Sequence, residues 1–84
     1  MNEDLTRKIV VWAGEVASRA AALPSRQARD GYLAERRREL VAGAVAEGAQ
    51  ERDAEMLAEA CMSAARRILT EILARRAGVT QGRA

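Results

Sequence analysis

The side chains that could carry catalytic or metal chemistry are few and scattered in this sequence of 84 residues. Histidine is absent, which removes the usual general base and the commonest metal ligand. The single cysteine cannot build a thiolate cage for a metal ion, and Ser18, Ser25 and Ser63 have no partner set of the kind that activates a nucleophile. No glycine-rich phosphate-binding motif is present. We therefore expect no enzyme activity, no metal site and no cofactor.

Two side chains with potential reactivity or stacking ability fall within apolar stripes. Cys61 lies in the middle of one stripe, so we expect a small buried side chain rather than a reactive thiol, which needs an exposed, electropositive setting. Trp12 lies at the centre of another, where core packing is favoured over ligand stacking, although a dimer interface would use it equally well.

These stripes imply helices, because the apolar residues recur with the period of an α-helix. The longest uninterrupted pattern follows Gly48 and contains neither glycine nor proline until Gly78, which should end the helix. Its apolar residues lie on two adjacent lines that cover about half of the circumference, too wide a surface for one neighbouring helix. The first line contains Ala54, Leu57, Cys61, Ala65, Ile68 and Ile72, and the second contains Ala58, Met62, Leu69 and Leu73.

The shorter helices are predicted from their end signals. Asn2 should cap the first helix and Pro24 should end it, because the residue before a proline is pushed out of the α region. The second helix could begin at Ser25 or only after Gly31, since a glycine within a helix costs about 1 kcal/mol relative to alanine. Gly48 suits a left-handed cap at its end, and the short loop that follows predicts an antiparallel hairpin with the third helix.

The sequence thus predicts an all-α fold, a three-helix antiparallel bundle with helices at about 3–22, 25–47 and 51–77. Residues 1–78 should form a single helical domain, and residues 79–84 a flexible C-terminal tail. The aliphatic content is only seven Leu, six Val and three Ile, with no Phe. A domain of this size has little stability to spare, so its better apolar surfaces should not stay in water. We therefore expect the bundle to dimerise.

The candidate interface is dominated by the apolar side of the third helix, which should supply the main contact face. It consists of Trp12, Arg37, Leu57, Met62, Ile68, Leu69, Ile72 and Leu73. Arg37 is unusual because it falls between Leu33 and Leu40 on the apolar face of the second helix. An extended stem that reaches water, or an ion pair with Glu59 across the hairpin, is favoured over a pair with a second subunit, because an unpaired buried charge is costly.

The charges are distributed unevenly around a formal net charge of +2. Acidic residues gather at the start of the third helix and arginines at its end, as the helix dipole favours. Arg67, Glu71 and Arg75 have the spacing of helical ion pairs. Glu51, Glu55 and Glu59 form an acidic line, which is either a solvated face or a docking surface for a basic partner.

A nucleic-acid-associated regulator is the alternative function. Its candidate basic patch consists of Arg66, Arg67, Arg75 and Arg76 at the end of the third helix. Ala44, Gly48 and Leu57 also have helix-turn-helix spacing. Carboxylates in the first turns of the third helix would repel phosphates, so nucleic acid is the less favoured partner.

The cellular setting is inferred from composition. A lone cysteine and the absence of a leader-like start indicate a reducing cytoplasm. The longest uncharged run, residues 40–46, is too short to cross a membrane, so no membrane association is expected. Thirteen Arg against one Lys, with abundant Ala and Gly, suggest a GC-rich bacterial genome.

The sequence favours a non-enzymatic helical protein–protein interaction module. We expect it to be a homodimer that acts as a small regulator or adaptor of another protein.

Overall fold

The computed structural model describes residues 3–81, and it confirms the predicted all-α fold of three helices. The helices are α1 (Glu3–Ala21), α2 (Arg26–Ala46) and α3 (Glu51–Gln81). Each packs against the other two, which makes a three-helix bundle. The described segment contains no β-strand.

The ends of α2 follow the signals in the sequence. The Ser25 hydroxyl accepts a hydrogen bond from the Ala28 N–H at 3.1 Å, so the helix begins at the earlier of the two predicted starts and Gly31 lies within it. At the other end Gly48 has a φ of 107°, a left-handed conformation that glycine adopts without steric cost. This turn reverses the chain into α3. The predicted cap of α1, Asn2, lies outside the described residues.

The C-terminal boundary of α3 differs from the prediction. The helix passes through Gly78 and continues to Gln81, so the expected stop at Gly78 is wrong. A glycine lowers helix stability by about 1 kcal/mol without breaking the hydrogen-bond ladder, and no proline follows to end it. The first three residues of the predicted tail, 79–81, are therefore helical, and residues 82–84 lie outside the described range.

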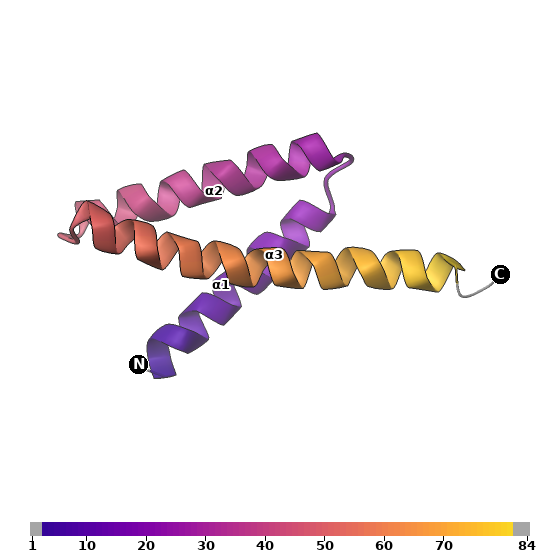
Figure 1. Ribbon diagram of the computed structural model, residues 1–84, viewed down its shortest axis with the longest axis horizontal. Helices are drawn as coiled ribbons and strands as arrows, with labels where there is room; N and C mark the ends of the chain where they lie inside the picture. Colours follow the sequence, from indigo (N-terminus) through magenta and orange to yellow (C-terminus); the bar gives the residue numbers. More distant parts are fainter. Residues whose placement is uncertain (1–2, 82–84) are drawn as a thin grey trace.

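The helices are arranged as a hairpin with a crossing helix. In Figure 1, α2 and α3 run antiparallel from the Gly48 turn, and α1 crosses the hairpin obliquely. The contact between α1 and α3 is the most extensive of the three. The molecule measures 53 × 28 × 15 Å, so it is thin in one direction and every helix has a side facing water.

The core consists mostly of alanine. Seven of the twelve buried apolar residues are alanines, and Met62 is the one large side chain that is completely enclosed among them. Met62 packs in one cluster with three α1 alanines, Ala13, Ala17 and Ala20, and with Ala65. Small side chains let two helices approach closely, and this brings α1 onto α3. We call the four alanines Ala13, Ala17, Ala20 and Ala65 the alanine seam.

Met62→Ala should therefore lower the free energy of unfolding by about 2–5 kcal/mol. The substitution leaves a cavity at the centre of the cluster of buried apolar residues that forms the core of the described chain. Urea denaturation followed by circular dichroism measures the change. Met56 lies on the same helix but is 65% exposed, so Met56→Ala is the matched control and should change stability by no more than about 0.5 kcal/mol. Equal effects of the two substitutions would contradict the proposed core.

Candidate interaction surfaces

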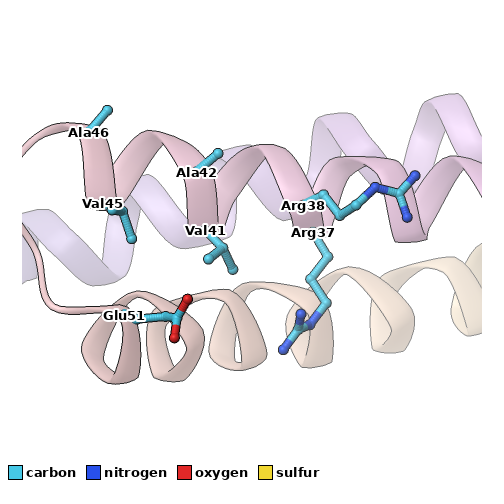
Figure 2. A pocket seen from close by; sticks show the side chains of 7 residues that line it. All are labelled: Arg37, Arg38, Val41, Ala42, Val45, Ala46 and Glu51. Atoms are coloured by element: carbon cyan, nitrogen blue, oxygen red, sulfur yellow. The ribbon is translucent and has the colours of Figure 1, made fainter.

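An open groove runs along the hairpin between α2 and the beginning of α3. Its volume is about 620 Å³, and four of the six α2 residues that line it are apolar. Figure 2 shows Val41, Val45 and Arg37 pointing from α2 toward α3, while Ala42 and Ala46 lie on the other side of α2. The full lining is Arg37, Arg38, Val41, Ala42, Val45, Ala46 and Glu51, and we call it the hairpin groove.

The charges at the two ends of the hairpin groove are opposite. Arg37 and Arg38 lie at the end nearer the middle of α2, and Glu51 lies at the end nearer the Gly48 turn. Val45, between them in the sequence, is 43% exposed. The hairpin groove is therefore an apolar strip with a basic end and an acidic end.

The triple-arginine run of α2 is engaged within the chain. Arg36 donates a hydrogen bond to Glu39 at 2.6 Å, and its guanidinium lies 5.1 Å from the centre of the Tyr32 ring. Arg38 donates to Glu35 at 3.0 Å. Both ion pairs are local and partly or largely exposed, so each contributes little to stability.

Arg37 forms the interhelical ion pair expected from the sequence. Its Nη2 lies 3.6 Å from Glu59 Oε2 across the hairpin, and its side chain is 37% exposed. The favoured intrachain pairing is therefore confirmed. The same contact accounts for Glu59, one member of the acidic line on α3, and all three members, Glu51, Glu55 and Glu59, are exposed.

A second, smaller cleft lies between the first half of α1 and the hairpin of α2 and α3. Its volume is about 200 Å³ and its lining is mostly apolar. Trp12 is half-buried there, next to Leu40 of α2 and to Leu57 and Cys61 of α3. The tryptophan therefore packs between helices within the chain, and Leu5, 39% exposed, lies at the edge of the cleft.

The candidate interface residues of α3 divide into buried and partly exposed groups. Met62 and Leu69 are enclosed within the chain and offer no surface to a partner. The partly exposed group contains Leu57, Ile68, Ile72 and Leu73. Ile68, Ile72 and Leu73 pack at the edges of the core, whereas Leu57 lines the cleft that Trp12 also lines.

The basic patch at the end of α3 is not a single surface. Arg76 Nη1 donates a hydrogen bond to the Ala21 carbonyl at 2.7 Å and so occupies an open acceptor at the end of α1. Arg66, Arg67 and Arg75 are exposed, and at 100° per residue they point in widely separated directions. Among the described side chains, neither Arg67 nor Arg75 forms an ion pair with Glu71, so the predicted helical ion pairs are absent.

The helix-turn-helix spacing is not matched by the geometry of the helices. The two helices of that motif cross at about 90–120°, whereas α2 and α3 lie antiparallel along each other (Figure 1). Nucleic-acid binding stays a prediction that depends on the exposed arginines alone.

Burial raises the pKa of the Cys61 thiol above its ordinary value, which lowers the fraction of reactive thiolate. Cys61 is 4% exposed, in keeping with its predicted packing role. No group of three or more Cys, Asp or Glu within residues 3–81 is placed to hold a metal ion. Of the three described helices, none has the length and apolar character needed to cross a membrane.

The residues of the hairpin groove other than Arg37 were not among the candidate interface positions. A signal for them exists in the sequence, because residues 40–46 are the longest uncharged run and helical periodicity places Val41, Ala42, Val45 and Ala46 within one half of the helix circumference. Their small size makes this side resemble an ordinary helix surface. Val10 and Val11 of α1 are also exposed apolar residues outside the candidate interface.

Comparison of the chain with protein-family models, with curated proteins and with solved structures finds no match.

Arg76→Met should lower the free energy of unfolding by about 0.5–1.5 kcal/mol, since it removes the hydrogen bond to the Ala21 carbonyl and the positive charge near the end of α1. Arg75→Met removes the same charge from the neighbouring, exposed position and is the matched control. Chemical denaturation of the two variants should separate them. If both substitutions lower the free energy of unfolding by the same amount, the hydrogen bond from Arg76 to the Ala21 carbonyl does not stabilise the fold.

Proposed function

We propose that this chain is a non-enzymatic helical protein–protein interaction module that works as a homodimer and serves as a small regulator or adaptor of another protein. One observation carries the proposal. The monomer encloses mainly alanines and leaves several larger aliphatic side chains in water, among them Val10, Val11, Val45 and Met56, which are 43–65% exposed.

This distribution is unfavourable for an isolated domain. Burying a side chain such as valine or methionine stabilises a fold by about 1.5–3 kcal/mol, whereas alanine contributes much less. A domain of this size has only a few kcal/mol of stability in total. Association that removes exposed aliphatic side chains from water is therefore the most direct source of additional stability.

The exposed valines lie in two separate places. Val45 belongs to the hairpin groove, while Val10 and Val11 lie on α1. An adaptor needs two surfaces, one for its own copy and one for another protein. This arrangement supports a module that dimerises through one surface and binds a partner through the other.

Sedimentation equilibrium of the purified chain should show a dimer at micromolar concentration. Dimerisation makes the stability of the fold depend on protein concentration. The midpoint of thermal unfolding should therefore also rise when the chain concentration is raised from about 1 μM to about 100 μM. A folded monomer at micromolar concentration, with a midpoint that does not depend on concentration, would show that the dimer does not form.

Affinity capture from a bacterial lysate, with and without nuclease, tests the adaptor role. The proposal expects one protein to be retained after nuclease treatment and to be lost when Val10 and Val11 are both changed to Ser. The matched control, Met56→Ser, should retain it. Loss of all bound material after nuclease treatment would favour the nucleic-acid alternative and the exposed arginines of α3.

A further inference from the structure

We infer that a second copy of this chain docks on the hairpin groove with two-fold symmetry, so that α2 of each protomer lies antiparallel against α2 of the other. In this arrangement Arg38 of each protomer faces Glu51 of the partner subunit. The inference rests on the proposed homodimer and specifies its interface.

The hairpin register fixes where the charges lie along the hairpin groove. Arg37 and Glu59 are paired across the hairpin at 3.6 Å, so they lie at the same level. Both helices rise by about 1.5 Å per residue and run in opposite directions. Eight residues back along α3 from Glu59 is Glu51, and eight residues on along α2 from Arg37 is Val45. Glu51 therefore lies level with Val45, and both line the hairpin groove.

This register makes the charge pattern self-complementary. Measured along the axis of α2, Arg38 lies about 5 Å from the midpoint between Val41 and Ala42, on the side of the basic end of the hairpin groove. Glu51 lies about 5 Å from the same midpoint, on the side of the acidic end. A two-fold axis through Val41 and Ala42 exchanges the two ends. It therefore brings each basic end opposite an acidic end, at two equivalent positions. An interface related by a two-fold axis requires such a surface, in which the same patch is complementary to itself.

The centre of the hairpin groove suits a second α2 helix. Val41, Ala42, Val45 and Ala46 form an uncharged strip, and the small alanines allow the backbones of two helices to approach closely. No charge lies on the proposed axis, so no like charges meet there. An unrelated partner would need a basic and an acidic residue at the same spacing as Arg38 and Glu51. A second copy of this chain carries these same two residues and therefore meets the requirement.

The charged residues are available for this exchange. Arg38 is 67% exposed and is paired with Glu35 on its own helix, whose side chain is 51% exposed; a surface pair of this kind is worth about 0.5 kcal/mol. Glu51 is exposed and is in no ion pair in the described part of the chain. Turning Arg38 toward Glu51 of the partner subunit therefore disrupts little in the monomer.

Charge reversal with mixing tests the arrangement. Arg38→Glu and Glu51→Arg should each weaken self-association by about tenfold or more, because each places like charges at both symmetric positions. An equimolar mixture of the two variants should form a heterodimer with wild-type affinity, since both positions then hold opposite charges. The double variant R38E/E51R should also regain self-association. Sedimentation and native mass spectrometry measure these affinities.

Matched controls separate the interface from general charge effects. Arg67→Glu reverses an exposed arginine elsewhere on α3, and Asp53→Arg reverses an exposed acid in the same first turn as Glu51. Both should leave the dimer affinity unchanged within about twofold. Circular dichroism confirms that each variant is folded, and rescue by mixing cannot arise from a folding defect.

The outcomes distinguish this inference from the proposed function. A monomeric wild-type chain overturns both. The wild-type chain could instead form a dimer that the single charge reversals do not weaken, or the mixture could show no preference for the heterodimer. Either result would contradict the proposed interface but not the proposed homodimer. As a second measurement, Val41→Cys in a Cys61→Ser background should crosslink to itself across the axis under mild oxidation, whereas Met56→Cys in the same background should not.

Discussion

The close packing of α1 on α3 through the alanine seam determines most of what else is seen in this molecule. Alanine has almost no side-chain entropy to lose and places two helix backbones close together. The cost is a core of small volume, in which Met62 is the one large enclosed side chain described. The larger aliphatic residues are consequently displaced to the edges of the bundle, where they remain partly in water. The partial exposure of Ile68, Ile72 and Leu73 beside this contact follows from the constraint.

The hairpin of α2 and α3 is held differently. Its contacts combine the Gly48 turn, the Arg37–Glu59 ion pair and a narrow apolar strip. Because the outward side of α2 is uncharged from residue 40 to residue 46, the hairpin presents an apolar surface on the side that its own chain leaves uncovered. Arg36, Arg37 and Arg38 are each paired with a carboxylate of the same chain.

Local signals predicted the helices well, while the assignment of surfaces required the three-dimensional arrangement. Ser25 and Gly48 act through residues within one turn, so their capping roles could be read from spacing alone. The pairing of Arg37 with Glu59 was accessible because a short loop fixes the hairpin register. The failure at Gly78 arose because a glycine lowers helix stability without preventing the helix.

The division of the apolar side of α3 could not be predicted in the same way. A stripe that covers half of a helix shows that two neighbours are needed, but it does not show which neighbour covers which residue. The oblique crossing of α1 buries Met62 and Leu69 and leaves Ile72 and Leu73 partly open. That crossing depends on side-chain volumes summed over two helices. For the same reason the hairpin groove appears only when α2 and α3 are placed together.

The alanine seam also limits how the sequence can change over evolutionary time. At Ala13, Ala17, Ala20 and Ala65, a larger side chain would force the helices apart at about 1–3 kcal/mol, and glycine would weaken its helix by about 1 kcal/mol. Alanine at exposed positions such as Ala42 and Ala46 carries no such restriction within the monomer. The abundant alanines of this chain thus belong to two populations, one nearly fixed and one free to vary. Among natural relatives, the side chains at the alanine seam should therefore keep the same size, and these positions would mark where α1 crosses α3.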